Sequence, residues 1–130
     1  MNFTLVILGP PYASQAPETA LRFARAALAS GHKIYRLFFY HDGVHNASNL
    51  ATVGQDEHNI PEHWRKIIED EQIDSVVCIA AATRRGIVSV SEAQRHDKPC
   101  ANLISGQTLS GLGQLIDASL NSDRVITFGA

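Results

Sequence analysis

Blocks of apolar and polar residues alternate along the chain in two distinct patterns. Short continuous apolar runs have the length of buried strands, whereas longer segments repeat apolar residues every three or four positions, as one face of a helix does. The runs that predict strands are Phe3–Leu8, Lys33–Tyr40, Asp74–Ile79, the weaker Pro99–Leu103, and Asp123–Phe128. The segments that predict helices are Pro17–Ser30, Pro61–Glu71, Val90–His96 and Ser110–Leu120.

The residues between these segments are typical of helix ends and turns. Gly31 follows the first predicted helix at its C-terminal cap, and Pro61 opens the second at the first helical position. His41-Asp42-Gly43 is typical of a turn, and Val44–Leu50 after it predicts one or two helical turns. Ala51–Asn59 is polar and predicts a loop.

Strands that alternate with helices predict an α/β fold with a mostly parallel sheet. The continuously apolar strands indicate burial on both faces of that sheet, and so helices on both sides. We therefore expect one α/β domain over residues 1–130, with five strands. In such sheets the functional site lies at the carboxyl ends of the strands. The segments that fall there are Gly9-Pro10-Pro11, Tyr40–Gly43, and Cys78 with the residues after it.

Composition narrows the functional classes. Apolar residues make up 45% of the 130-residue chain and charged residues 18%, which is typical of a globular protein and not of a disordered one. The formal net charge of −2 gives no basis for direct binding to nucleic acid.

The first apolar run predicts a strand and not a targeting signal. No basic segment precedes it, and Pro10 and Pro11 interrupt it. No stretch approaches the roughly 18 apolar residues of a membrane span. We therefore expect a cytoplasmic protein without membrane contact, whose two cysteines, Cys78 and Cys100, are reduced.

The segment Val76–Gly86 carries the strongest indication of chemistry. Cys78 stands at the end of a buried strand and is followed by Ala80-Ala81-Ala82, Arg84 and Arg85. If a short helix begins after the strand, its free N–H groups favour an anionic sulfur such as a thiolate or persulfide. The arginines would add positive potential, and the alanines leave room beside the sulfur. The competing interpretation is a buried cysteine that only fills space.

Cys78 and Arg84 also match the C-x₅-R spacing of cysteine phosphatases. Those loops rely on glycine, whose N–H groups converge on the phosphate, and on Ser or Thr after the arginine. Here the intervening residues include no glycine, and Arg85 stands at the Ser/Thr position. Phosphatase chemistry is disfavoured, and a small phosphate- or ligand-binding flavodoxin-like module is kept as an alternative.

Several motifs in the same order resemble a known family. Phe38–Val44, Cys78–Gly86 and Ser110–Leu115 closely resemble the DsrE/TusD family. Further similarity is found at Gly9-Pro10, Tyr12, Gln15, Ala118–Leu120 and Asp123–Val125. The likeness extends over nearly the whole chain.

This resemblance implies a small flavodoxin-like domain that works as a sulfurtransferase subunit and whose active cysteine is Cys78. Such a subunit accepts sulfane sulfur as a persulfide and relays it to a partner protein, without a metal or an organic cofactor. Arg84, Arg85, His41 and Asp42 are the residues that we expect to support the site. A non-catalytic scaffold subunit of the same assembly is disfavoured because Cys78 is present.

The resemblance also implies partners. The TusD branch acts in a heterohexamer with TusB-like and TusC-like subunits, takes sulfur from a TusA-like donor and passes it to a TusE-like acceptor. The product of that relay is 2-thiouridine at the tRNA wobble position. The DsrE branch forms a similar assembly with DsrF-like and DsrH-like subunits in dissimilatory sulfur oxidation. The motifs do not separate the branches, and we favour TusD as the more widespread role.

Three other features of the sequence are candidate sites. His41 and His45 are spaced to share a helix face, but no cysteine or carboxylate cluster completes a metal site, and we expect none. Gly111 and Gly113 near a helix start are interpreted as close packing or a partner contact and not as a phosphate cradle. Cys100 lies outside the family's pattern, and we expect a buried inert thiol.

Overall fold

Strands and helices follow one another along the chain largely in the predicted order. The computed structural model describes residues 1–129. The strands are β1 (Asn2–Ile7), β2 (Lys33–Phe39), β3 (Ser75–Cys78), β4 (Thr108–Ser110) and β5 (Arg124–Phe128). The helices are α1 (Ala16–Ala29), α2 (Ile60–Glu71), α3 (Ile79–Arg84), α4 (Val90–Arg95) and α5 (Gly113–Asn121), with a 3₁₀ segment, η1 (His41–Ala47).

The five strands form one sheet in the order β4-β3-β2-β1-β5, and every neighbouring pair is parallel. The predicted α/β fold with a parallel five-stranded sheet is therefore confirmed. Flavodoxin itself has the order 2-1-3-4-5. The likeness to flavodoxin thus lies in the layers and not in the strand order.

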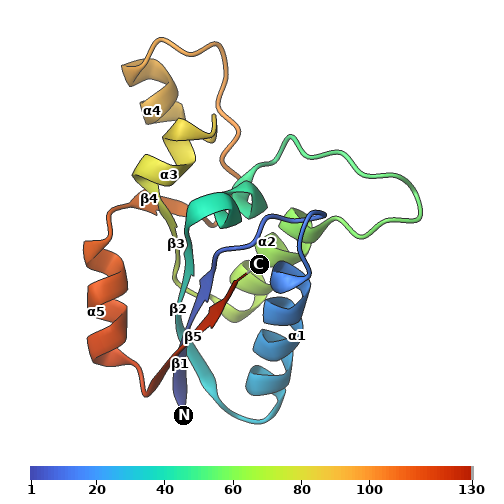
Figure 1. The fold of residues 1–130 in the computed structure, drawn as a ribbon, viewed down its shortest axis with the longest axis vertical. Helices are drawn as coiled ribbons and strands as arrows, with labels where there is room; N and C mark the ends of the chain where they lie inside the picture. Colours follow the sequence, from blue (N-terminus) through green and yellow to red (C-terminus); the bar gives the residue numbers. More distant parts are fainter. Residues whose placement is uncertain (130) are drawn as a thin grey trace.

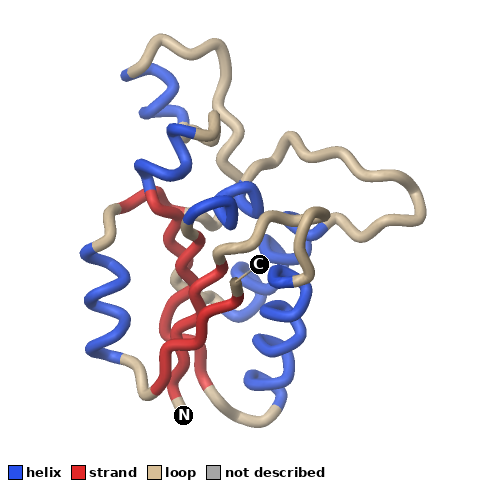
Figure 2. Tube along the Cα trace, viewed as in Figure 1, coloured by secondary structure: helices blue, strands red, loops and turns tan. Residues whose placement is uncertain are grey.

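The direction of each connection determines which face a helix covers. From β1 to β4 the chain steps across the sheet in one direction, and from β4 to β5 it returns to the far side of β1. Because such crossovers are right-handed, α1 and α2 lie on one face and α5 on the other, as Figure 1 shows. Beyond the carboxyl edge of the sheet stand α3 and α4. Figure 2 shows the long loops that leave η1 and α4 at the same end.

The main core lies between the sheet and the layer of α1 and α2. Trp64 of α2 is fully buried and meets Phe39 of β2 edge to face, with ring centroids 5.2 Å apart. Ala20 and Ala24 on the buried side of α1 allow this helix to approach the strands closely. Most of the large buried side chains lie in this one cluster, as hydrophobic burial requires of a small domain.

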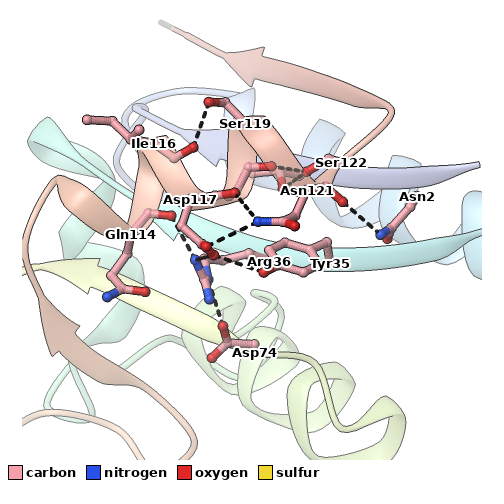
Figure 3. Close-up of polar contacts among 12 residues, drawn as sticks. Asn2, Tyr35, Arg36, Asp74, Gln114, Ile116, Asp117, Ser119, Asn121 and Ser122 are labelled. Carbon is pink, nitrogen blue, oxygen red and sulfur yellow. Dashed lines mark hydrogen bonds and ion pairs between the residues drawn. The ribbon is translucent and has the colours of Figure 1, made fainter.

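Polar contacts hold α5 on the opposite face (Figure 3). Arg36 of β2 is buried, and its guanidinium donates to Asp74 at 2.6 Å and to Asp117 of α5 at 2.9 Å. The Tyr35 hydroxyl donates to Asp117 at 2.8 Å. The hydrogen bond from Tyr35 and then the neighbouring Arg36 lower the pKa of Asp117. The sheet therefore fixes α5 through a charged cluster.

The predicted fourth strand, Pro99–Leu103, is wrong. The position beside β3 is taken by Thr108–Ser110. In the predicted segment the N–H groups of Asn102 and Leu103 donate to the Val88 carbonyl, and Leu103 makes only an isolated bridge with Ser48. These two backbone N–H groups are thus bonded to the loop that holds Val88 and not to a strand.

Two boundaries near the sheet edge also differ from the prediction. The last helix begins at Gly113 and not at Ser110, because Ser110 is the last residue of β4. The turn predicted at His41–Gly43 is the start of η1. Gly43 is required there because a Cβ atom would lie 2.0 Å from the Ile7 carbonyl oxygen. This contact brings η1 directly against the end of β1.

Candidate functional site

Cys78 is the last residue of β3 and directly precedes α3. In the β3–β4 pairing its partner is Ser110. On the other side Val77 pairs with Phe39, so Tyr40, the next residue along, lies beside Cys78. The carboxyl edge of the sheet therefore holds Cys78 between Tyr40 and Ser110.

The side chain of Cys78 points toward the face of the sheet that α5 covers. Phe39 contacts Trp64 of α2, so its partner Val77 also faces α2. Successive strand residues point to opposite faces, which directs Cys78 to the other side. Only 3% of Cys78 is exposed. The thiol is thus sheltered from solvent at the end of the sheet where α/β proteins place their sites.

The six residues after Cys78 form the helix α3, which is the short helix considered for this segment from the sequence. Ala81 and Ala82 are buried, whereas Ala80 lies on the exposed side. A phosphate-binding loop needs several N–H groups converging on one point, but in α3 the N–H groups run parallel to the helix axis, and only those after the first turn bond to preceding carbonyls. This geometry argues against a phosphatase-like cradle between Cys78 and Arg84.

Two of the expected supporting residues meet in the structure. Arg85 follows α3, and its Nε donates to Asp42 of η1 at 2.8 Å. Its Nη1 also donates to the Ala81 carbonyl at 3.1 Å. The hydrogen bond from Arg85 lowers the pKa of Asp42. The charge of Arg85 is therefore directed to a carboxylate, and the pair joins η1 to α3.

The other two supporting residues are exposed and take no part in that ion pair. The His41 ring stacks on Tyr40, with centroids 4.1 Å apart and planes inclined by 19°. The φ angle of His41 is +50°, an uncommon conformation that turns the chain at the end of β2. Arg84 makes no ion pair with any residue in 1–129 and lines a surface hollow.

Tyr40 and Ser110 were given no individual role by the sequence, although they flank Cys78. The sequence pattern predicts Tyr40 at the end of a strand and Ser110 at the start of a helix. No local pattern identifies Ser110 as the neighbour of Cys78, because the register of two strands 30 residues apart is a tertiary property. Both residues carry a hydroxyl group, and the strand register places their backbones beside that of Cys78.

One expectation about another residue is wrong, and one of two alternatives for the glycines is excluded. Cys100 is exposed and not buried, because Pro99–Leu103 is a loop and not a strand. Gly111 and Gly113 do not serve close packing within the chain, since a Cβ atom at either would meet nothing within 4 Å. Both glycines are exposed, which leaves a partner contact as their interpretation.

The histidines do not assemble into a cluster. His58 and His63 have ring centroids 5.7 Å apart, and burial is the main cause that lowers the pKa of His63. Within residues 1–129, no group of three His, Cys, Asp or Glu side chains is arranged to hold a metal ion. In the same part of the chain, no helix has the length and apolar character needed to cross a membrane.

Comparison with known proteins gives matches along nearly the whole chain. A model of the DsrE/DsrF-like family matches residues 1–128. The chain is 51% identical over 129 residues to the sulfurtransferase TusD homolog of Pseudomonas aeruginosa, covering 99% of this chain and 98% of that protein. It is 47% identical to the putative sulfurtransferase DsrE of Allochromatium vinosum, covering 99% of each. To the sulfurtransferase TusD of Salmonella typhi it is 43% identical, covering 98% of this chain and 100% of that one.

A solved structure shows the same fold. The crystal structure of the ychN protein from E. coli matches with a TM-score of 0.77 at 25% identity, covering 98% of this chain and 100% of that one. The chain therefore belongs to the DsrE/DsrF-like family. The class expected from the sequence, a sulfurtransferase of this family, is confirmed by the relatives named TusD and DsrE.

Proposed function

We propose that this chain is the sulfur-carrying subunit of a relay and that it holds the transferred sulfur as a persulfide on Cys78. One observation carries the proposal: the thiol lies at the carboxyl edge of the sheet, 3% exposed, between Tyr40 and Ser110. A persulfide needs shelter from stray thiols, and this position gives it. Cys100 is exposed in a loop and lacks such shelter.

The transfer consists of two exchange steps that balance without an oxidant or reductant. The Cys78 thiolate attacks the outer sulfur of a donor persulfide, a new S–S bond forms, and the donor leaves as a thiolate. An acceptor thiolate then attacks the outer sulfur on Cys78. The bond between that sulfur and Cys78 breaks, and Cys78 leaves as a thiolate. No metal or organic cofactor takes part in either step.

The neighbouring side chains support this chemistry by position. Tyr40, which directly follows β2, and Ser110, at the end of β4, flank Cys78, and a hydroxyl group is able to donate a hydrogen bond to an anionic sulfur. The ion pair of Asp42 with Arg85 keeps η1 and α3 together at this edge. His41, stacked on Tyr40, forms the exposed side of the same region.

A multi-subunit assembly explains the outward face of α5. Leu112, Ile116 and Leu120 recur every fourth residue and are 46%, 63% and 80% exposed. The one charged residue of the helix, Asp117, faces Arg36 in the sheet. An apolar stripe without charges is typical of a surface that a partner covers. We propose that a related TusB-like or TusC-like subunit covers it, as in a heterohexamer.

The relay that we favour supplies 2-thiouridine at the tRNA wobble position. Its donor is a TusA-like protein and its acceptor is a TusE-like protein. We place this relay in the cytoplasm, where free thiols stay reduced. A second candidate is supported by the 47% identity to a protein named DsrE. In that case DsrF-like and DsrH-like subunits replace the TusB-like and TusC-like ones, and the sulfur comes from dissimilatory oxidation.

Loading with a persulfide donor tests the site. Mass spectrometry should show a gain of about 32 Da, one sulfur atom, that reductant removes. Cys78→Ser should abolish the gain, whereas Cys100→Ser is the matched control and should retain it. A gain that maps to Cys100, or no gain on a folded protein, would contradict the proposal.

A further inference from the structure

A basic hollow lies along the exposed side of α3. Its volume is about 460 Å³, and its lining residues come from α3 and from the segment around α4. They are Ala80, Thr83, Arg84, Val88, His96 and Lys98. The residues from α3 recur at the spacing of one helix face, so the hollow runs along the helix that begins after Cys78.

The cations of this hollow lack the carboxylate partners that their neighbours have. Arg85 pairs with Asp42 at 2.8 Å, and Arg95 pairs with Glu92 at 3.5 Å. Glu92 also lies 3.2 Å from the His96 ring. Within the described residues 1–129, Arg84 and Lys98 make no ion pair, and Asp97, next to Lys98 in sequence, forms none with them.

The local charge contrasts with the charge of the whole chain. Residues 84–98 contain four Arg or Lys and two Asp or Glu, whereas the chain as a whole carries −2. Excess positive charge is therefore concentrated in the segment that forms the hollow. Unpaired cations that converge on one open hollow are complementary to carboxylates.

The hollow is also close to the thiol. A helix rises about 1.5 Å per residue, so Arg84 lies about 9 Å along α3 from Cys78, and Ala80 lies about 3 Å from it. An extended chain covers about 3.3 Å per residue. Along the helix axis, a segment held at Arg84 thus needs only about three further residues to come level with Cys78.

We propose that the basic hollow binds an acidic segment of the protein that exchanges sulfur with Cys78, with its carboxylates on Arg84 and Lys98. The inference rests on the proposed function and specifies the chemistry of the partner. A nearly buried thiol reacts efficiently only when its partner is held at the entrance, and paired charges provide both orientation and a faster encounter. Ala80 and Val88 add apolar contact that suits a peptide better than a small anion.

A binding experiment on the unmodified protein tests this inference. The probe is a fluorescent eight-residue peptide without cysteine that alternates glutamate and alanine, and its glutamine analogue is the reference. Fluorescence anisotropy at low salt should show binding of the glutamate peptide. The variant Arg84→Gln/Lys98→Gln should weaken it about five- to tenfold. Arg95→Gln is the matched control, because Arg95 is paired with Glu92 and lies outside the hollow.

Three results would overturn the inference. The first is equal binding of the glutamate and glutamine peptides, and the second is equal binding of the glutamate peptide by wild type and the double variant. The third is binding of inorganic phosphate that depends on Arg84 and Lys98 without binding of the peptide, which would make the hollow a small-anion site. Circular dichroism confirms that the variants are folded.

The same peptides separate this inference from the proposed function. With a cysteine at one end, the glutamate peptide should take sulfur from loaded Cys78 faster than the glutamine peptide, by about the same factor as in binding. A protein that binds the peptide but never gains sulfur on Cys78 would support the basic hollow as a peptide site and contradict the proposed relay. A protein that gains sulfur on Cys78 but does not bind the acidic peptide would support the proposed relay and contradict the inference about the basic hollow.

Discussion

The Arg85 guanidinium donates a hydrogen bond to the Asp42 carboxylate over 2.8 Å, although the two residues are 43 positions apart in sequence. The pair joins η1, which follows β2, to the end of α3, which begins directly after Cys78. Asp42 is 60% exposed, so the contribution of this pair to global stability is small. Its effect is local, because it joins two segments at the sheet edge that holds the thiol.

Loss of this ion pair should make Cys78 more reactive. In Asp42→Asn, η1 and α3 separate more often, and we expect iodoacetamide to modify Cys78 about two- to fivefold faster. Cys100 is exposed and provides a reference thiol in the same chain. Peptide mass spectrometry gives the ratio of the two rates. An unchanged ratio would show that the pair does not control access to the thiol.

The contact of η1 with the end of β1 should tolerate no side chain at Gly43. A Cβ atom there lies 2.0 Å from the Ile7 carbonyl oxygen, a backbone atom that cannot move aside freely. Gly43→Ala should therefore lower the free energy of unfolding by about 3 kcal/mol, measured by urea denaturation. Gly111→Ala is the control, because its Cβ meets nothing within 4 Å, and it should change stability by less than about 0.5 kcal/mol.

The charged cluster under α5 should stabilise the fold more than an exposed ion pair does. Replacing Arg36 by Met removes its hydrogen bonds to Asp74, Asp117 and the Gln114 carbonyl and should cost about 2 kcal/mol. Lys66→Met breaks an exposed pair with Asp70 and should cost less than about 0.5 kcal/mol. Equal effects of the two substitutions would contradict a structural role for Arg36.

The cluster also predicts a pH dependence. The pKa of Asp117 is lowered in the folded protein, so its stabilising effect is fully present above the ordinary carboxyl pKa of about 3.9. That effect is lost as the pH falls through the lower folded value. The stability difference between wild type and Asp117→Asn should therefore be constant from pH 7 to about pH 5 and shrink below about pH 4. A difference that grows on acidification would have the wrong sign.

The apolar face of α5 should be required for assembly and not for folding. Ile116→Glu should abolish co-purification with TusB-like and TusC-like subunits while the isolated chain stays folded, because Ile116 is 63% exposed. Val90→Glu is the matched control, since Val90 is 65% exposed but lies on α4. Size-exclusion chromatography of the co-expressed subunits distinguishes the outcomes. An intact complex with Ile116→Glu would place the interface elsewhere.

Deletion of the gene should lower 2-thiouridine in tRNA without stopping persulfide formation upstream. A carrier moves an existing sulfane sulfur between thiols, so its loss deprives the acceptor and leaves the donor active. Cys78→Ser should fail to restore the nucleoside, and Cys100→Ser should restore it. Unchanged 2-thiouridine together with a defect in oxidising stored sulfur would assign the chain to the DsrE branch.

Local patterns identified most elements because each depends on residues close in sequence. The apolar run Asp74–Ile79, followed by three alanines, predicted a strand that ends near Cys78 and a short segment after it. The structure shows β3 ending at Cys78 and α3 starting at Ile79. The pattern failed at β4, where only three residues pair with β3 and the segment Pro99–Leu103 has more apolar character. So short a strand carries too few residues for an apolar pattern.

The sequence by itself determined the α/β class, the strand-end position of Cys78 and the family. The tertiary structure alone decided the strand order, the placement of Cys78 between Tyr40 and Ser110, the Asp42–Arg85 pair and the exposure of Cys100. Hydrophobic periodicity reports which face of an element is buried, and it contains no information on which distant element covers that face. Strand register and long-range ion pairs depend on that choice, so only the folded chain defines them.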